Sequence, residues 1–305
     1  MLTPALDSYM ATRRAVGFQL RDTEHILRDF VAFASAKGDT HVHSRTVLEW
    51  IQSRNGNPLR KCVRLRTVIL WARYLHAEDE HHEVPPQDTF GRHRPQRRPP
   101  FLFTLQDVDA LIRGARRLGP DHSLQPHVYS TLFGLLASTG LRISEALNLR
   151  IEDVTRQGLI VRNTKFGKSR MLPLHTTTRE RVAIYLLRRI REAGACPYVF
   201  VSIRGRKLHV NTVRGVFRRL VYSLGVAGPQ DQLRPRLHDL RFYFANQALT
   251  NSPGDHEGIS RHMVALTTYL GHSDVRSGYW YLEATPALFA KIAARCEDFA
   301  YGGNP

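Results

Sequence analysis

Two residues near the carboxyl end of the sequence combine a nucleophile with an imidazole. His272 precedes Tyr281 by nine positions, with a Ser-Asp pair and a glycine between them. A tyrosine hydroxyl ordinarily has a pKa of about 10, so it attacks an electrophile well only where positive charge lies nearby. Tyr279 and Trp280 stand beside it, and a packed aromatic cluster is the alternative interpretation of this segment.

Two earlier segments supply arginines and a second imidazole. Arg142 follows a Thr-Gly break and starts a predicted helix, whose N-terminus also favours an anion. Glu145 follows three residues later on the same face, where it could hold the arginine. His238 and Arg241 are also three residues apart, so one helix face could present both to one phosphate. For each pair, a solvated surface contact is the alternative.

A predicted β-hairpin carries two further cations at its tip. Strands are expected at 159–161 and 170–172, with residues 164–168 between them. Lys165 is a mobile cation that could deliver a proton, and Lys168 is its rival on the same loop. Attack on a phosphodiester needs a nucleophile, cations for the nonbridging oxygens, a base and an acid. Together these segments offer all four.

A predicted domain from residue 101 to 305 must position these groups. Thr104 is expected to cap its first helix, and the apolar helix 128–138 is expected at its centre. Hydrophobic periodicity predicts further helices at 179–192, 211–224, 238–248, 262–270 and 286–299.

Residues 1–83 are predicted to form a separate helical bundle. Helices are expected at 21–37 and 59–77, and a capping box at Thr46 is expected to open a short helix between them. No acidic residue lies between Gly56 and Ala77, so basic side chains there lack i, i+4 partners. We expect phosphate contacts from Arg60, Lys61, Arg64 and Arg66.

Residues 84–100 are predicted to be an extended basic linker. They contain five prolines and five Arg or His side chains, without apolar periodicity. Arg97 and Arg98 are expected to follow a nucleic-acid backbone.

The charge balance favours a polyanionic partner. The 305 residues include 44 Lys and Arg against 27 Asp and Glu, a net charge of +17. Nucleic acid is the first expectation and an anionic membrane surface the second. The sequence has no apolar run of the roughly 18 residues that a membrane span needs, and no secretion signal at its start, so we expect a cytoplasmic protein.

Cysteines and histidines suggest neither a disulfide framework nor a metal site. Cys62, Cys196 and Cys296 are far apart and form no C-x-x-C, which is typical of small buried residues. The histidines of one polar segment lack an i, i+4 pair backed by carboxylates or thiolates, so we expect no metal there. These are His76, His81, His82 and His93.

In order and local spacing, the motifs resemble the tyrosine recombinase family, which includes phage integrases and Xer-like proteins. They are TGLRISEALNL (139–149), TKFGKSRMLPL (164–174), HDLR (238–241), LGHS (270–273) and then Tyr281. The resemblance runs from about 101 to 299, and the context of Tyr281 looks like that of recombinases carried on transposons. The FYFA stretch after Arg241 departs from the small or polar residues often found there.

The resemblance implies covalent catalysis on DNA. Tyr281 would attack the scissile phosphate, leaving a 3′-phosphotyrosyl link and a free 5′-hydroxyl. Arg142 and Arg241 would clamp the nonbridging oxygens. Because the covalent link conserves the bond energy, no ATP, metal or other cofactor would be required.

The remaining site residues would move protons or bind the phosphate. In the resemblance, Lys165 would be the general acid for the leaving oxygen. We also expect Lys168, its rival on the same loop, to contact DNA. His238 would accept or share the tyrosine proton, and His272 would hydrogen-bond the phosphate.

The resemblance also implies a fold and an assembly. The chain would be mainly α with a small β-sheet: a helical, SAM-like core-binding domain followed by a mixed α/β catalytic domain. Its partners would be a double-stranded DNA site and further protomers, in a homo-tetramer or a mixed tetramer of related recombinases. The tail helix from residue 286 to 300 would dock on a neighbouring protomer; covering its own domain is the alternative.

Three other functions compete with strand exchange. A type IB topoisomerase-like relaxase would use the same chemistry as a monomer without a defined site. An accessory subunit would bind a site but yield recombinant product only with partner recombinases. An RNA-binding or membrane-surface protein is the third alternative, and the ordered Arg, Lys, His-Arg, His and Tyr series speaks against it.

The basic N-terminal region and linker predict salt-sensitive binding to duplex DNA. Each neutralised phosphate releases counterions, so the affinity should fall steeply as salt rises. Titrating duplex DNA over a series of salt concentrations measures this slope. A slope near zero would contradict the predicted clamp.

Overall fold

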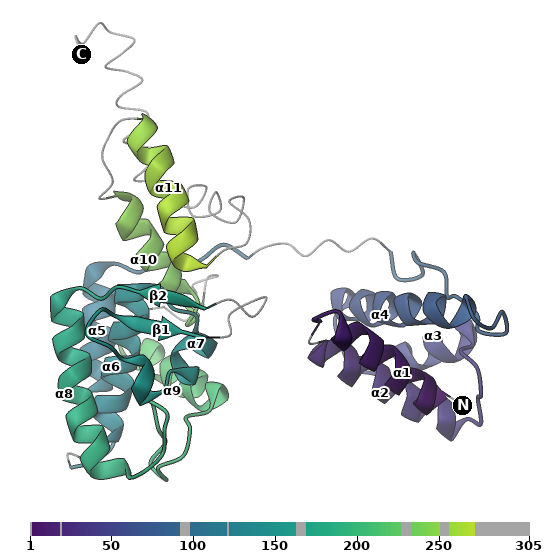
Figure 1. Cartoon of the computed structure of the whole chain (residues 1–305), viewed down its shortest axis with the longest axis horizontal. Coiled ribbons are helices and arrows are strands. Elements are labelled where there is room, and N and C mark those ends of the chain that lie inside the picture. The colour runs from purple at the N-terminus through teal and green to yellow at the C-terminus, as the bar shows by residue number, and fades with distance from the viewer. Residues whose placement is uncertain are drawn as a thin grey trace, which may run out of the picture. The chain divides into compact units, whose positions relative to one another are not determined.

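The chain folds as two compact units, Met1–Arg98 and Pro99–Pro305 (Figure 1). The computed structural model describes residues 2–18, 20–91, 98–120, 122–162, 169–226, 234–250 and 256–271, with the backbone alone at 256–260. Within these described residues, the elements are mostly helices with one small sheet, as predicted. None of the helices described is both long and apolar enough to cross a membrane.

The first unit packs four helices around an aromatic core. The ring of Phe30 meets those of Trp50 and Trp71 edge-on, with centroids 5.3 and 6.3 Å apart. All three side chains are fully buried, and such contacts add to the free energy of area burial. The helices are α1 (Leu2–Ala15), α2 (Arg21–Ala36), α3 (Ser44–Ser53) and α4 (Pro58–His76).

The start of α3 differs from the predicted capping box at Thr46. The helix begins at Ser44, and Thr46 is buried within its first turn. The Glu83 carboxylate accepts a hydrogen bond of 2.8 Å from the backbone N–H of Ser44. A carboxylate at this position satisfies a donor left unpaired by the helix and lies at the positive end of its dipole. This contact spans 39 residues, so local spacing could not reveal it.

The segment expected to be a linker is partly packed on the first unit. Val84 and Phe90 lie against the N-terminal core, and the Cys62 thiol is 3.5 Å from the Gly91 carbonyl oxygen. Two hydrophobic side chains among the prolines are thus enough to dock residues 84–91, and residues 92–97 lie outside the described part. Cys62 and Cys196 are free thiols and half-buried rather than buried.

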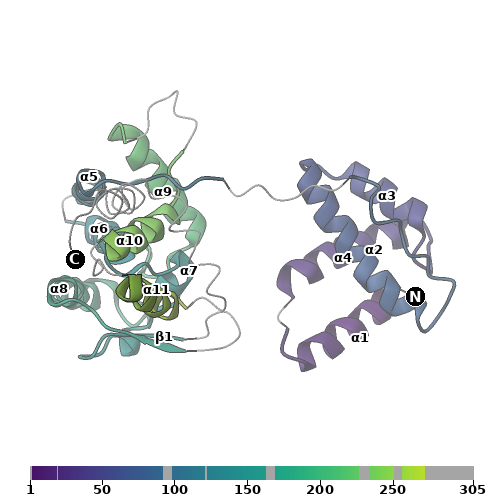
Figure 2. The same ribbon diagram turned by 90° about the horizontal axis from the view of Figure 1, so that it is seen from above.

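Helix α6 (Gln125–Thr139) is the centre of the second unit. It packs against α5 (Leu105–Ala115), α8 (Thr176–Ala193) and α10 (Asp239–Thr250), as Figure 2 shows. The expected cap at Thr104 is confirmed. Its hydroxyl accepts from the backbone N–H of Asp107 at 3.1 Å, and the Asp107 carboxylate accepts from the backbone N–H of Thr104 at 2.8 Å.

The predicted hairpin is confirmed where it is described. β1 (Leu159–Val161) pairs antiparallel with β2 (Arg170–Leu172), so that Leu159 faces Leu172 and Val161 faces Arg170. The hairpin tip, 163–168, lies outside the described residues. The remaining elements are α7 (Ile143–Asn148), a 3₁₀ turn (Ile151–Asp153), α9 (Val210–Ser223) and α11 (His256–Leu270).

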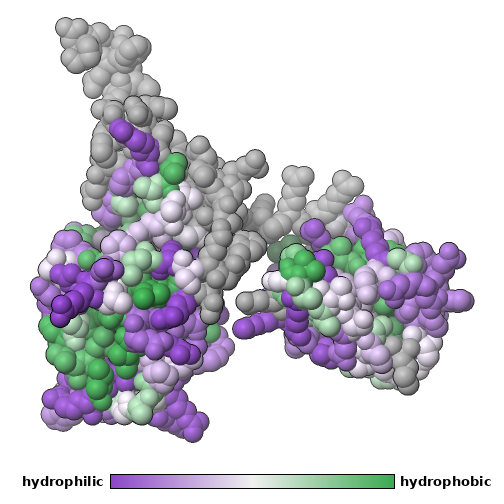
Figure 3. All heavy atoms as spheres, viewed as in Figure 1, coloured by the Kyte–Doolittle hydropathy of each residue, from purple (hydrophilic) through white to green (hydrophobic). Residues whose placement is uncertain are grey.

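Apolar side chains gather on the outer face of α8 (Figure 3). Ile184, Leu187 and Ile190 are 62%, 73% and 52% exposed. Burial against α6 comes instead from Val182 and Tyr185 on the other side of the same helix. Among the residues described, this face of the second unit therefore stays open to solvent.

Candidate active site

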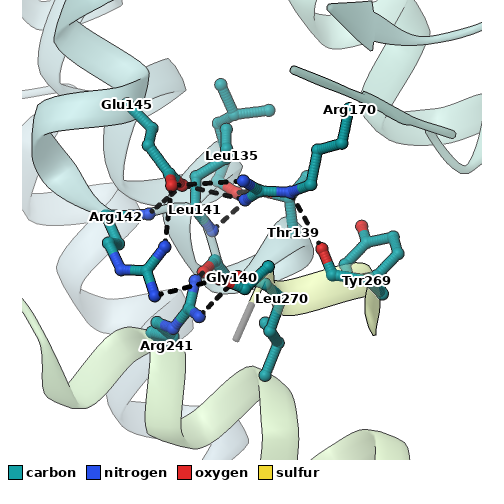
Figure 4. A network of polar contacts seen from close by, with 11 residues as sticks. Leu135, Thr139, Gly140, Leu141, Arg142, Glu145, Arg170, Arg241, Tyr269 and Leu270 are labelled. Atoms are coloured by element: carbon teal, nitrogen blue, oxygen red, sulfur yellow. Dashed lines mark hydrogen bonds and ion pairs between the residues drawn. The ribbon is translucent and has the colours of Figure 1, made fainter. Parts of the chain in front are cut away.

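The buried carboxylate of Glu145 joins two arginines from different elements (Figure 4). Arg142, at the start of α7, donates its backbone N–H to one carboxylate oxygen at 3.0 Å and its Nη1 to the other at 2.9 Å. Arg170, from β2, donates two parallel bonds of 3.2 and 2.9 Å. Such forked pairing fixes the plane of a guanidinium as well as its position. The expected Arg142–Glu145 contact is therefore an internal connection and not a solvated surface pair.

The charges around Glu145 keep it ionised. Burial would raise the pKa of this carboxyl, but hydrogen bonds from Arg170 and Arg142 outweigh burial and lower the pKa. One negative charge therefore lies between two guanidinium groups. Its presence lets Arg142 and Arg170 approach the same point with less mutual repulsion.

Arg241 lies deeper than either of these arginines. It is 1% exposed on α10, where its Nη1 donates to the Gly140 carbonyl oxygen and its Nη2 to that of Leu270, both at 2.7 Å. These carbonyls belong to the turn before Arg142 and to the end of α11. Arg241 therefore connects three parts of the chain that are far apart in sequence.

The turn at Gly140 requires glycine. Its φ is +62°, and an added Cβ would lie 2.6 Å from Phe244 Cδ1 and 2.9 Å from Leu270 Cδ2. The FYFA stretch after Arg241 supplies Phe244 to this contact, while Phe242 and Ala245 are buried between α10 and α11. The departure of this stretch from the family pattern is thus a matter of packing.

Three arginines hold three successive carbonyls at the end of α11. Arg170 Nε donates to the Tyr269 carbonyl at 3.0 Å, Arg241 to that of Leu270, and Arg142 Nη2 reaches that of Gly271 at 3.5 Å. The last carbonyls of a helix have no partner within the helix and lie at the negative end of its dipole. Cations are the partners that such an end favours, and the chain immediately before His272 is fixed by them.

His238 lies at the entry to α10, beside these arginines. It is exposed, yet the protein packed around it lowers its pKa, chiefly through desolvation and then through the charge of Arg241. Asp239, which is 1% exposed, fixes the backbone of this entry by accepting from the backbone N–H of Arg236 at 2.8 Å. A lowered pKa leaves the imidazole neutral at pH 7, so it can accept a proton.

The structure brings together three predicted residues and adds one that the sequence did not reveal. Arg142 and Arg241 meet at the end of α11, and His238 lies near enough to both for their charges to lower its pKa. Lys165, Lys168, His272 and Tyr281 lie outside the described residues. Arg170 lies within the TKFGKSRMLPL motif, whose sequence alone does not indicate a role for it. Its signal was a lone arginine in a short strand between Ser169 and two apolar residues.

The predicted DNA contacts of the first unit differ in exposure. Arg60 and Arg66 are exposed on α4, whereas Lys61 and Arg64 are half-buried. Lys61 Nζ lies 5.9 Å from the centroid of the Phe90 ring, and Arg64 donates to the Arg54 carbonyl at 3.4 Å. Arg98 is exposed, and Arg97 lies outside the described residues.

Comparison with known proteins identifies the family. The model of the phage integrase family matches residues 103–287. The chain belongs to the phage integrase family. Membership implies catalysis of DNA cleavage and rejoining. The y4rB protein of Sinorhizobium fredii, named as an integrase/recombinase, is 36% identical over 302 residues that cover 96% of each chain.

Solved structures of recombinases and integrases bound to DNA share the fold. The XerH recombinase bound to a palindromic difH substrate has a TM-score of 0.64 and 16% identity, covering 96% of this chain and 84% of its own. The integrase of the transposon Tn1549, in complex with transposon right end DNA, has a TM-score of 0.62 and 16% identity. It covers 97% of this chain and 98% of its own.

Replacing Arg170 by methionine should destabilise the second unit by about 3 kcal/mol at pH 7, because it removes one partner of a buried carboxylate. The Glu145 pKa is lowered in the folded protein, so its ionised form stabilises the fold above its ordinary value of 4.5. That contribution is lost as pH falls through the lower folded value. The difference between Arg170→Met and wild type should therefore shrink in acid.

Urea unfolding at pH 7 and pH 4 measures both effects. Arg204→Met, at an exposed loop position, is the matched control and should change stability by no more than about 0.5 kcal/mol. An Arg170→Met protein as stable as wild type at pH 7 would show that the network around Glu145 contributes nothing.

Proposed function

We propose that this protein is a site-specific DNA recombinase that cuts and rejoins DNA through a 3′-phosphotyrosyl intermediate. The observation that supports it best is the set of three arginines on the carbonyls of Tyr269, Leu270 and Gly271. Through these contacts Arg142 and Arg241, the two predicted phosphate-binding arginines, lie against the chain just before His272. The family membership and the DNA-bound relatives support the same function.

In the proposed reaction, the Tyr281 hydroxyl attacks the scissile phosphorus. A Tyr–O–P bond forms as the P–O5′ bond breaks, and the released 5′-oxygen takes a proton from Lys165. The tyrosine proton passes to His238, whose lowered pKa keeps it neutral and able to accept. A 5′-hydroxyl from the partner duplex then attacks the phosphotyrosine and reverses these steps.

Charge stabilisation falls to Arg142 and Arg241. The pentacoordinate phosphate places negative charge on its nonbridging oxygens, where guanidinium groups form forked hydrogen bonds. Arg142 is 30% exposed, so it is accessible to a phosphate, and Glu145 holds it in place beforehand. His272 adds a hydrogen bond to the same phosphate. Fixing these donors before DNA arrives avoids reorganising them in the transition state.

The partners that we propose are a double-stranded recombination site and other protomers in a tetramer, either homogeneous or mixed with related recombinases. Arg60, Lys61, Arg64, Arg66, Arg97, Arg98 and Lys168 bind backbone phosphates in this proposal. The tail from 286 to 300 docks on a neighbouring protomer, so that assembly and cleavage are linked.

Tyr281→Phe should abolish covalent attachment to DNA. A duplex nicked next to the scissile phosphate releases a short fragment on cleavage, so the adduct accumulates and can be counted on a denaturing gel. Tyr279→Phe is the matched control and should retain the adduct. A Tyr281→Phe protein that still forms it would exclude Tyr281 as the nucleophile.

The competing functions are tested with intact sites. Recombinant product from the protein alone would exclude the accessory role. Relaxation of supercoiled DNA by a monomer, without a defined site, would favour the relaxase.

Lys165→Ala should slow cleavage by roughly 10²- to 10⁴-fold, because general acid catalysis supplies that much. A 5′-bridging sulfur leaves as a thiolate of lower basicity than an alkoxide and needs no proton. Single-turnover cleavage of the sulfur-containing strand should therefore be nearly equal for Lys165→Ala and wild type. For Lys168→Ala, the cleavage rate relative to wild type should be the same with the sulfur-containing strand as with the normal strand. If the sulfur rescued Lys168→Ala and not Lys165→Ala, the roles of the two lysines would be exchanged.

A further inference from the structure

Three metal-binding side chains meet in the first unit, far along the sequence from the active-site motifs. His41 lies between α2 and α3, and Asp79 and His81 lie in the turn after α4. His41 Nε2 is 3.2 Å from one oxygen of Asp79, and His81 Nδ1 is 2.7 Å from the other. The three potential ligand atoms all lie within 4.8 Å of one another.

We propose that His41, Asp79 and His81 bind one divalent ion of the zinc class, with water as the fourth ligand. Two imidazole nitrogens and a carboxylate oxygen form a donor set that suits Zn²⁺, whereas Mg²⁺ and Ca²⁺ prefer oxygen alone. The outward side of the group is open, since the His81 side chain is 82% exposed. A three-ligand site with an open position is common for zinc.

The ligand groups are oriented by neighbouring polar atoms. The Thr40 hydroxyl lies 2.9 Å from His41 Nδ1, which leaves Nε2 directed at Asp79. The backbone N–H of His81 donates to the Asp79 carboxylate at 3.0 Å. These contacts orient the Asp79 carboxylate toward both imidazoles before an ion binds.

Hydrogen bonds outside the ligand set hold the two segments together. The backbone N–H of Val42 donates to His82 Nδ1 at 3.1 Å, and that of Glu83 donates to the Val42 carbonyl at 2.8 Å. Around an ion, tetrahedral ligand atoms stand roughly 3.3 Å apart. Binding thus needs an adjustment of the present group: His81 Nδ1 must move away from the Asp79 oxygen at 2.7 Å, and separations of up to 4.8 Å must close.

The site joins residues that sequence spacing does not associate. His41 is 38 positions from Asp79, so the histidines of the 76–93 segment alone gave no sign of a metal site. A bound ion would connect the turn after α4 to the segment before α3. It would stabilise the first unit and take no part in the proposed DNA chemistry, so neither proposal depends on the other.

Titration of the full-length protein, carrying no histidine tag, tests the site. Zinc is added in competition with a chromophoric chelator, and unfolding temperature is recorded with and without zinc. His81→Ala and Asp79→Asn should each weaken zinc binding at the tightest site at least about tenfold. Even the loss of a residue that only hydrogen-bonds to a metal ligand reduces metal affinity by that factor. Both should lose the rise in unfolding temperature that zinc gives the wild type. Magnesium should give neither effect.

His25→Ala is the matched control, because His25 is exposed on α2 and outside the group. It should bind zinc like the wild type. Equal unfolding temperatures of all variants without metal establish that each is folded. His81→Ala is the variant expected to disturb the fold least, because the His81 side chain is exposed. Equal zinc affinity in wild type and His81→Ala would overturn the proposal, as would absence of tight binding by the wild type. The trio would then be a hydrogen-bonded link only.

Discussion

The shared carboxylate of Glu145 is the interaction on which the arrangement of the second unit's polar centre depends. Two guanidinium groups at one point would repel each other, and a single buried anion between them adds two attractive interactions that offset this repulsion. Arg142 and Arg170 thereby bring the start of α7 and the strand β2 together. Arg170 extends the link to α11 through the Tyr269 carbonyl. The positions of α7, the hairpin and the segment before His272 thus all depend on the charge of Glu145.

Arginine serves two purposes in this centre. Buried Arg241 satisfies backbone carbonyls, and Arg142, 30% exposed, keeps a face toward solvent; in the proposed reaction both also bind the phosphate. The same positive charges lower the pKa of His238, after the larger effect of desolvation. The surrounding charges thus limit the basicity of this imidazole, which is the group that accepts the tyrosine proton in the proposed reaction. The same arginine charges therefore both hold the backbone together and lower the pKa of His238.

Local patterns predicted the elements well because their causes are local. The alternation and turn residues around β1 and β2, the Thr104 cap and the Gly140 break each act within a few residues. Contacts across the fold were not predictable in this way. Glu83 caps α3 from 39 residues away, and Arg241 reaches Gly140 across 101 residues. At the site, the roles of Arg142, His238 and Arg241 stay predictions from residue types in order, whereas the contacts of Arg170 needed the tertiary structure.

The bonds of Arg241 also determine when the polar centre can form during synthesis. Gly140 and Leu270 are 130 positions apart, and one side chain between them in sequence holds both. A nascent chain that has not yet released Leu270 has only one of these partners and lacks the carbonyls that Arg170 and Arg142 bind. Contacts between residues so far apart in sequence form late, because the entropy of closing the long loop must be lost before the contact is gained. An incomplete chain can therefore fold its first unit on the ribosome while its arginines remain unassembled.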